Sequence, residues 1–359
     1  MKKFVLHLLA LLCALSCAEA GSSAIPDGYV IGFYNVENLF DAAHDKGKND
    51  YDFLPDGANG WTAERYARKR ENIASVIRAM KEENGAWHTL LGLAEVENDQ
   101  VLEDLLQEPS VAEAGYEYVH FEGPDRRGID CALLYRPQEF TLLEKRSIPY
   151  DFDSPGIRFE MTRDEMRNFR TRDVLMVRGK IAGEMVAVFV AHLPSRKGEK
   201  AEETRARGAE IIHENALALM QKHPGIKIVV MGDMNDDPED RSQTEYLHAK
   251  ATKEETGEAD FYSPFISTLR RGIGTLTYHG DWNLFDIILV NQALADAPAG
   301  SLHIVPCVAG KYDGCVFKKP FMTQQEGKYK GSPKRTFSGE TFLDGYSDHY
   351  PTYIVISNK

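Results

Sequence analysis

Asp233 and Asn235 are the residues whose types and spacing first suggest chemistry in this chain. They follow the apolar segment 226–230, which is rich in β-branched residues and is closed by Gly232. Such a segment predicts a buried strand that ends in a turn. Side chains two positions apart point the same way from extended backbone. The carboxylate could then accept a proton or touch a metal while the amide fixes a nucleophile, although an Asx turn would use the same two residue types.

Other apolar runs also end in, or begin after, a polar residue that can ligate a metal or move a proton. These residues are Asn35, Glu95, His192, Asp348 and His349. Sites in α/β sheets collect at strand ends, because loops vary there over a rigid scaffold. One such residue alone would be read as a solvated or capping group. Repeated placement of this kind predicts a single shared site.

The surrounding sequence predicts the elements that would carry these residues. Apolar residues at helical spacing predict amphipathic helices at 64–81, with Thr62 as the cap, and at 201–221. No linker, repeat or low-complexity tract interrupts residues 25–359, so one large α/β domain is expected there. Apolar runs predict strands at 30–34, 90–94, 129–135, 140–146, 174–180, 185–191, 226–230, 275–279, 285–290 and 353–356.

Six short motifs lie at these strand ends. They are Tyr34-Asn35-Val36-Glu37-Asn38, Ala94-Glu95-Val96-Glu97-Asn98, Ala191-His192-Leu193, Gly232-Asp233-Met234-Asn235, Phe285-Asp286-Ile287-Ile288 and Ser347-Asp348-His349-Tyr350-Pro351. In this order the motifs resemble those of the endonuclease/exonuclease/phosphatase superfamily, which includes deoxyribonucleases, apurinic endonucleases, sphingomyelinases and inositol-polyphosphate phosphatases. The resemblance implies a deoxyribonuclease-like, four-layer α/β/β/α sandwich with two central mixed β-sheets, and it specifies substrate poorly.

The resemblance implies a divalent metal that holds the phosphoryl oxygens and neutralises charge in the transition state. Glu95 is the expected ligand, Asp348 is a second ligand, and Asn35 is either a neutral ligand or a positioning group. Hard carboxylates in small number suit Mg²⁺, with Mn²⁺ or Ca²⁺ as alternatives. The sequence has no CxxC pair and no Cys/His zinc spacing, which also favours an oxygen-bound metal.

By the same resemblance, Asp233 activates or orients the attacking water, and Asn235 holds that water or a phosphate oxygen. His192 and His349 would face the phosphate, stabilise the pentacovalent state and protonate the departing oxygen.

Each histidine needs a partner that fixes its tautomer. Asp286 lies in an otherwise apolar run, where an unpaired carboxylate would be costly, so it is the expected partner of His349. Asp130 is the expected partner of His192. The alternative for Asp130 is an ion pair with one of the neighbouring arginines, Arg126 and Arg127.

Three arginines are candidates for binding the substrate phosphate. Arg172 stands where deoxyribonuclease-like members have a phosphate-binding arginine, and the alternative is an ion pair at the strand edge with Asp173 or Glu184. Arg196 follows His192, and Arg335 precedes Asp348. Both could add positive charge around the anion, although basic loop residues are usually only solvated.

Residues 1–20 have the features of a secretory signal, namely two early lysines, an apolar run and the cleavage site Ala18-Glu19-Ala20. Export to the periplasm or the extracellular space is therefore expected. The alternative is acylation at Cys17, which would give a surface lipoprotein. Cys307 and Cys315 could form a disulfide in an oxidising compartment, whereas Cys131 is expected in the core.

The formal net charge is −13, and loss of Lys2, Lys3 and Glu19 with the signal would make it −14. An acidic chain has no general attraction for polyphosphate outside a local basic patch. This argues against a tight, non-catalytic nucleic-acid binder. It does not exclude a hydrolase that contacts its substrate briefly and carries a divalent cation.

The sequence therefore predicts an exported, monomeric, metal-dependent phosphodiesterase without a stable protein partner, and first of all a nuclease. The alternative is a lipid or phosphoinositide phosphodiesterase or phosphatase. A sphingomyelinase-like enzyme would need an exposed aromatic hairpin, and the segment 260–277 offers aromatic residues without a paired-aromatic tip. A secreted binding module on the same scaffold is a third hypothesis, and the complete set of site residues argues against it.

Overall fold

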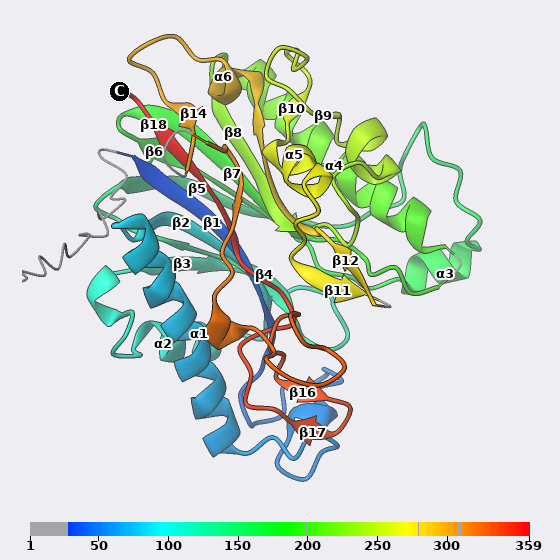
Figure 1. Ribbon diagram of the computed structural model, residues 1–359. Coiled ribbons are helices and arrows are strands. Elements are labelled where there is room, and N and C mark those ends of the chain that lie inside the picture. Colours follow the sequence, from blue (N-terminus) through cyan, green and yellow to red (C-terminus); the bar gives the residue numbers. More distant parts are fainter. Residues whose placement is uncertain (1–27, 199, 279, 308–310) are drawn as a thin grey trace, which may run out of the picture.

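The computed structural model describes residues 28–198, 200–278, 280–307 and 311–359. The predicted signal at 1–20, including Cys17, lies outside the described residues. Within these residues the chain folds into two seven-stranded mixed β-sheets that pack face to face, with helices on both outer sides (Figure 1). The α/β/β/α sandwich expected from the sequence is therefore present.

The first sheet is built around a parallel pair, β1 and β2, with antiparallel strands on either side. A short strand, β15, also pairs with β18. The strand order is β14 (His303–Val305), β18 (Thr352–Ser357), β1 (Tyr29–Leu39), β2 (His88–Val96), β4 (Asp130–Tyr135) and β3 (Glu117–His120), with β15 at Cys315–Val316.

The second sheet has a parallel pair, β7 and β8, at its centre. Its strand order is β5 (Phe140–Ile148), β6 (Val174–Ile181), β7 (Glu184–His192), β8 (Lys227–Asp233), β13 (Asp286–Asn291), β10 (Phe261–Tyr262) and β9 (Ala249–Lys250). Two small hairpins lie outside both sheets, namely β11 (Leu276–Tyr278) with β12 (Asp281–Asn283), and β16 (Phe337–Ser338) with β17 (Thr341–Phe342).

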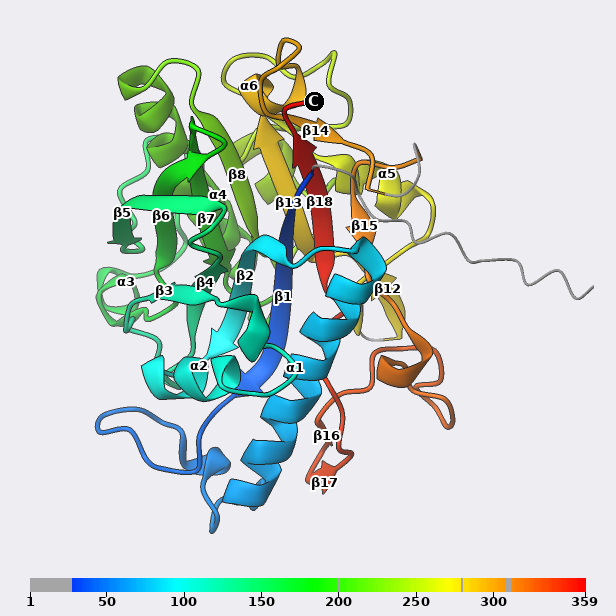
Figure 2. The same ribbon diagram turned by 90° about the vertical axis from the view of Figure 1, so that its left-hand side faces the viewer.

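Helices cover the outer faces of the two sheets. Figures 1 and 2 show α1 and α2 on the side of the first sheet and α3, α4 and α5 on the side of the second, whereas α6 lies at one end of the sandwich, where it contacts β14 of the first sheet and β13 and β8 of the second. Their bounds are Ala63–Asn84 (α1), Asp99–Leu106 (α2), Arg163–Asn168 (α3), Ala201–Lys222 (α4), Pro264–Arg270 (α5) and Gln292–Ala295 (α6). Short 3-10 or π turns occupy Tyr51–Phe53, Ala112–Ala114, Ser242–Tyr246 and Pro320–Met322.

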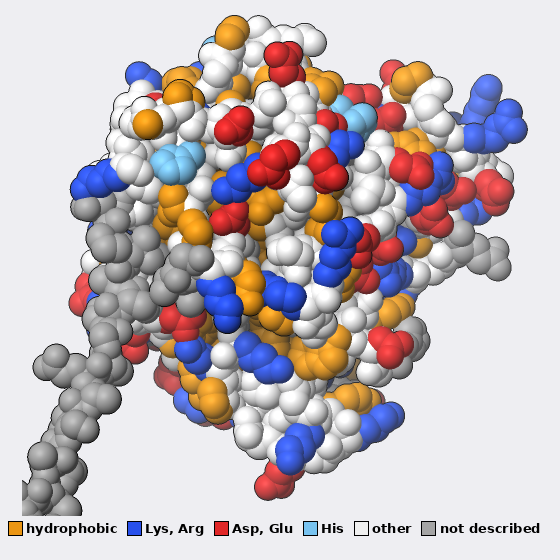
Figure 3. All heavy atoms as spheres, turned by 45° about the horizontal axis from the view of Figure 1, so that its top comes forward, with side chains coloured by type: hydrophobic (Ala, Val, Ile, Leu, Met, Phe, Trp, Pro, Cys, Tyr) orange, Lys and Arg blue, Asp and Glu red, His pale blue; other side chains and the backbone are white. Residues whose placement is uncertain are grey.

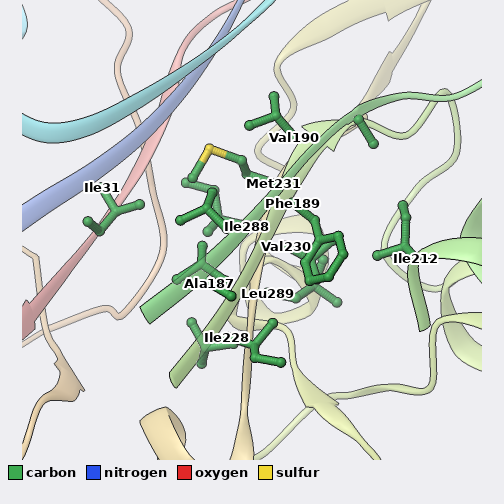
Figure 4. Close-up of a cluster of buried hydrophobic side chains, with 14 of the residues drawn as sticks. Ile31, Ala187, Phe189, Val190, Ile212, Ile228, Val230, Met231, Ile288 and Leu289 are labelled. Atoms are coloured by element: carbon green, nitrogen blue, oxygen red, sulfur yellow. The ribbon is translucent and has the colours of Figure 1, made fainter. Parts of the chain in front are cut away.

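The central strands are apolar on both faces because each sheet is covered on both sides. In β1, Ile31 belongs to the core between the sheets, whereas Val30 packs in the core beneath α1. Figure 4 shows Met231 of β8 on the side of Ile31, and other side chains of the second sheet reaching toward α4. A Cβ on Gly92 would lie 2.5 Å from Met231 Sδ, so glycine permits this close approach of the sheets.

The structure confirms the predicted strands and both long helices, apart from residue 279, which lies outside the described residues. Thr62 caps α1, because its side chain accepts a hydrogen bond from Arg65 N. Cys307 and Cys315 form the expected disulfide, and Cys131 is a buried free thiol. Among the described residues, no helix is both long and apolar enough to cross a membrane.

Candidate active site

The register of the second sheet places three candidate catalytic side chains in one row. β7 runs parallel to β8 with His192 opposite Asp233, and β13 runs antiparallel to β8 with Asp286 opposite the same Asp233. Each of these residues is the terminal residue of its strand. The row therefore lies at one end of the sandwich, where β11, β12, β16 and β17 also lie (Figure 1).

The first sheet contributes Asn35 to this row. Asn35 Nδ2 donates a 2.9 Å hydrogen bond to Asp233 Oδ2, and Asn35 Oδ1 accepts one from Glu37 N. Both the nitrogen and the oxygen of the buried Asn35 amide thus form hydrogen bonds within the protein. This geometry favours the positioning role for Asn35 over the role of a metal ligand.

His349 precedes β18 and is held from two sides. Its Nδ1 lies 2.7 Å from Asp286 Oδ2, and its backbone N–H donates to Ser347 Oγ. Ser347 Oγ in turn donates to the backbone carbonyl of Asn35. The structure thus brings together His349 and Asp286 as the sequence predicted, with His349 Nε2 3.8 Å from Asp233 Oδ2.

The two histidines are in opposite electrostatic environments. Burial, aided by the charge of Arg172, lowers the pKa of His192 well below its usual value. Burial also acts to lower the pKa of His349, but Asp286 and Asp233 outweigh it and raise that pKa well above its usual value. His349 is therefore the cation and His192 the neutral imidazole, a division that suits acid–base work at one site.

Asp233 should set an acidic limit to any catalysis at this site. Burial raises the pKa of this carboxyl from 3.8 to about 6, although His349 acts in the opposite direction. The ionised form that a water-activating group needs is therefore lost as the pH falls through about 6. We expect kcat/KM, measured from pH 4.5 to 8 with saturating metal, to fall below pH 6. Samples incubated at each pH and assayed at pH 7 control for unfolding, and constant activity down to pH 4.5 would contradict this assignment.

Several non-glycine residues near the site have a left-handed backbone. The φ angles are 51° for Glu37, 53° for Asn38, 65° for Glu95 and 51° for Asn235. Such conformations are uncommon outside glycine, and they persist where the surrounding structure imposes them, as at functional sites. Asn235 is further fixed because its N–H donates to Asp233 Oδ1.

Glu95 has the setting expected of a ligand for a hard cation. Its Oε2 accepts a 2.9 Å hydrogen bond from Asn38 N, and its Oε1 lies 3.9 Å from His192 Nε2. No lysine or arginine in the described part of the chain forms an ion pair with it. An anionic oxygen that lines a cleft without a cationic partner fits a divalent ion such as Mg²⁺.

Asp348, the second predicted ligand, already has a cationic partner. Arg335 donates to Asp348 Oδ2 at 2.6 Å and also lies 3.6 Å from Glu37. Asp348 would have to share or exchange this partner in order to bind a metal. Arg335 lines the cleft, so its contact with a substrate phosphate stays a prediction. In the structure its guanidinium contacts the carboxylates of Asp348 and Glu37.

Glu37 was not a candidate in the sequence, although it lies in the first motif. It is buried, and burial raises its pKa to about 7. Its Oε2 accepts a hydrogen bond from Thr336 N and lies 3.7 Å from Lys69 Nζ. Lys69 is itself buried in α1 and donates to Thr336 Oγ1 and to the carbonyl of Tyr346. The pair therefore fastens the segment before Asp348 to the first sheet and α1.

Replacing Lys69 by methionine should lower the free energy of unfolding by about 3 kcal/mol, because the change removes the buried ammonium group that contacts Glu37, Thr336 Oγ1 and the Tyr346 carbonyl. Denaturant unfolding at pH 8 measures this value. Arg68→Met is the matched control on the same helix, where the half-exposed arginine pairs with Asp344 and should contribute at most about 1 kcal/mol. Equal effects of the two changes would contradict a structural role for the buried pair.

Asp130 is not the partner of His192, contrary to the prediction. Its Oδ2 accepts a hydrogen bond from Gly123 N and lies 3.8 Å from His120 Nε2. His192 Nδ1, in contrast, is buried without a hydrogen-bond partner. The alternative pairing of Asp130 with a neighbouring arginine is not formed either. Sequence proximity could not reveal His120, which comes from the adjacent strand β3.

Arg172 lines the cleft but pairs with neither Asp173 nor Glu184. Its terminal nitrogens donate to the carbonyl of Leu193 and, at 3.4 Å, to Asp125, while its Nε has no partner. The buried guanidinium is thus oriented toward the site by Leu193 and Asp125, neither of which was a predicted partner.

Arg196 is not brought into the cleft. It packs over the ring of Phe285 and donates to the carbonyl of Asn235. It also contacts three acidic side chains of the loop after β8, which are Asp236, Asp237 and Asp240. Its positive charge is therefore used to hold that loop, and the predicted phosphate contact is not supported by this position.

A cleft of about 1250 Å³ opens over the candidate residues. Its walls carry cations from separate parts of the chain, namely Arg126, Arg127, Arg170, Arg172, Lys197, Lys328 and Arg335, together with Tyr278 and Tyr329. In the sequence, Arg126 and Arg127 were expected only as partners of Asp130, and Arg170, Lys328 and the two tyrosines were not candidates. For Arg126 and Arg127, the feature of the sequence that could have indicated a place in the cleft was their position in a charged loop directly before a predicted strand.

A family model described as the endonuclease/exonuclease/phosphatase family matches residues 30–358. Comparison with the curated proteins gives no match.

Solved structures with a similar fold include three proteins that share 15% sequence identity or less with this chain. The human Nocturnin catalytic domain with bound sulfate matches with a TM-score of 0.51 and 14% identity, covering 92% of this chain and 94% of that chain. A mannosyl-6-phosphatase from Bacteroides thetaiotaomicron matches with a TM-score of 0.50 and 15% identity, covering 91% and 99%. Humanized D. rerio TDP2 matches with a TM-score of 0.50 and 13% identity, covering 92% and 98%. At this identity the likeness concerns the fold.

Proposed function

Because the chain belongs to the endonuclease/exonuclease/phosphatase family, whose members hydrolyse phosphoester bonds, we propose that it is an exported, divalent-metal-dependent phosphodiesterase and, within this class, a nuclease. The observation that carries the proposal is the large cleft, whose cationic walls surround Glu95, Asp233 and His349. A phosphodiester polymer presents a repeated anion, and such walls could contact it on both sides of the scissile bond.

The distribution of charge supports a polyanionic substrate. The chain as a whole has a formal net charge of −13, and acidic and basic side chains are interspersed on the face drawn in Figure 3. The cleft instead gathers cations from four separate loops, with Arg126 and Arg127 on one segment and Lys328 on another. A locally positive cleft in an acidic protein attracts an anionic substrate to the site alone.

The geometry supports separate roles for the chain's own residues. Asp233, held by Asn35, would take a proton from the attacking water, and the immobilised amide of Asn235 would position that water or a phosphate oxygen. The His349 imidazolium would stabilise the negative charge on the phosphoryl oxygens and protonate the leaving oxygen. Neutral His192 would donate a hydrogen bond to the phosphate. A cation bound by Glu95, and by Asp348 once freed from Arg335, would supply Lewis-acid stabilisation of the phosphoryl oxygens.

Export is supported by two independent features. The first 20 residues read as a signal with a cleavage site after Ala20, and the described part of the chain contains the Cys307–Cys315 disulfide. Disulfides of this kind persist in oxidising compartments. Mass spectrometry of the exported protein distinguishes a chain that begins near Gly21 from one acylated at Cys17.

The sphingomyelinase-like alternative gains no support from the aromatic residues of segment 260–277. Phe261 and Tyr262 form the buried strand β10, and Phe265 is buried in α5. These aromatic side chains belong to the core and are not available for membrane contact.

A substrate panel tests the proposal. Supercoiled plasmid DNA, RNA, sphingomyelin vesicles and inositol polyphosphates are each incubated with Mg²⁺, Mn²⁺ or Ca²⁺, with Asp233→Asn as the inactive control. We expect metal-dependent nicking or degradation of a nucleic acid that the variant does not catalyse. Turnover of only a lipid or a monoester would reject the nuclease assignment, and no turnover of any phosphoester would reject the enzymatic one.

A further inference from the structure

A second group of metal-ligating side chains lies where β3 and β4 come together, outside the residues that line the cleft. We propose that His120, Glu122 and Asp130 bind a divalent transition-metal ion, with Zn²⁺ as the expected occupant. Each of the three offers a ligand atom, and these atoms lie within 4.8 Å of one another. One imidazole and two carboxylates suit Zn²⁺ better than Mg²⁺ or Ca²⁺, which prefer oxygen ligands alone.

The imidazole of His120 carries the proposal. Its side chain is 1% exposed, yet Nε2 has no hydrogen-bond partner, and a buried polar atom without a partner is costly. Nε2 faces the carboxylate of Asp130, whose Oδ2 is 3.8 Å away. This distance is too long for a hydrogen bond, but a bound ion could lie between the two groups.

The other nitrogen of the same ring has the partner that a metal-binding histidine needs. His120 Nδ1 lies 2.9 Å from Asp99 Oδ1. When Nδ1–H donates to this carboxylate, the tautomer is fixed and the lone pair of Nε2 points into the cluster. A carboxylate behind the ring is the usual arrangement around histidine ligands of metals.

Asp130 is also held in place by its neighbours. Gly123 N donates to Asp130 Oδ2 at 3.1 Å, and a Cβ on Gly123 would lie 2.3 Å from Asp130 Oδ1. Glycine at this position therefore allows the loop to close over the carboxylate. One oxygen of Glu122 lies 3.4 Å from Lys48 Nζ, and its carboxylate also has a second oxygen.

The position of the cluster gives the ion a structural role beyond the proposed hydrolytic site. His120 ends β3 and Asp130 begins β4, so a shared ion would tie together both ends of the intervening loop (Figure 2). That loop carries Asp125, which pairs with Arg172, and it carries Arg126 and Arg127, which line the cleft. Binding of Zn²⁺ would therefore fix the basic wall of the cleft.

Zinc binding is measured by isothermal titration of the full, metal-free protein with ZnCl₂. Glu122 is exposed, so Glu122→Gln should fold normally. We expect this variant to lose at least about 10-fold in affinity at one zinc site. Glu258→Gln, a change at an exposed carboxylate outside the cluster, should bind as the unmodified protein does. Glu95→Gln should keep this site as well, which separates it from any ion in the cleft.

Protection from trypsin provides a second readout that does not depend on catalysis. Cleavage after the exposed Arg126 and Arg127 should become slower when Zn²⁺ is added to the unmodified protein, and this protection should be absent in Glu122→Gln. The proposal is overturned if Glu122→Gln and Asp130→Asn bind Zn²⁺ with the stoichiometry and affinity of the unmodified protein. It is also overturned if only Glu95→Gln removes zinc binding.

A proton is the alternative occupant of the cluster. Burial acts to lower the pKa of His120, but hydrogen bonds and charge from Asp130 and Asp99 outweigh it and raise this pKa. An imidazolium bridging the two carboxylates, with no zinc bound at pH 7.5, would also reject the proposal.

Discussion

Replacing His349 by alanine is expected to lower kcat by about 10²- to 10⁴-fold, the loss typical of a single acid–base group. The reason is electrostatic as well as geometric. His349 is the cationic histidine of the site because Asp286 and Asp233 outweigh its burial, and its Nε2 points at the row that contains Asp233. Removing the ring would take away both a positive charge near phosphorus and the proton for the leaving oxygen.

Asp286 should act with His349 as one unit. Its Oδ2 contacts His349 Nδ1 at 2.7 Å and also accepts a hydrogen bond from Thr275. Asp286→Ala should therefore lower kcat by at least about 10²-fold, and the double variant should lose far less than the product of the two single losses. The measurements are kcat for both singles and the double, with thermal unfolding midpoints.

The controls for this cycle separate chemistry from folding. Asp286 is fully buried, so its removal should also lower the unfolding midpoint, and Asp286→Asn keeps the shape of the side chain. His213→Ala changes a buried histidine that contacts the carbonyl of Ala259 away from the cleft, and it should leave kcat nearly unchanged. If the loss of kcat in the double variant equalled the product of the two single losses, Asp286 would only stabilise its strand.

Chelation should abolish turnover, and Glu95→Gln should lower kcat at ordinary Mg²⁺ by about 10²- to 10³-fold, as loss of one strong electrostatic group does. Glutamine keeps the size of the side chain and an oxygen, but it removes the negative charge that a hard cation requires. The fold should survive, because Glu95 forms no ion pair with a lysine or arginine in the described chain and glutamine has a side chain of the same size.

The metal dependence of each variant is the measurement that decides this prediction. Titration with MgCl₂ should show a higher metal requirement for Glu95→Gln than for the unmodified protein. Glu326→Gln, which changes another carboxylate lining the cleft, should leave that requirement unchanged. Full activity in excess chelator, or identical metal titrations for both variants, would remove Glu95 from the role of ligand.

Much of the fold was determined locally and could be predicted from the sequence. Apolar β-branched runs specified the central strands, because a sheet covered on both faces buries successive side chains alike. Helical spacing and Thr62 specified α1. The polar residue at the end of a run placed His192 and Asp233 at strand termini, and parallel pairing then brought them to one edge. The strands, the helix and the residues at the strand ends could be predicted because each depends on residues that are close together in the sequence.

The partners of the site residues were decided only by the tertiary structure. Asp130 was expected beside His192, yet strand pairing set it against His120. Arg196 looked like Arg172 in the sequence, but the loop after β8 used its charge to neutralise its own carboxylates. Both arginines carry the same charge, so residue type could not separate a group that lines the cleft from one that holds a loop.

The basic wall of the cleft was also decided by the tertiary structure. Its cations come from segments far apart in the chain, such as those of Arg127, Arg170 and Lys328, and only Arg172 and Arg335 among them were predicted to contact the substrate. Glu37 and Lys69 likewise meet only because α1 packs on the first sheet. Coulomb interactions depend on distance in space and on burial. The sequence therefore determined which groups end the strands, and folding decided which charges they face.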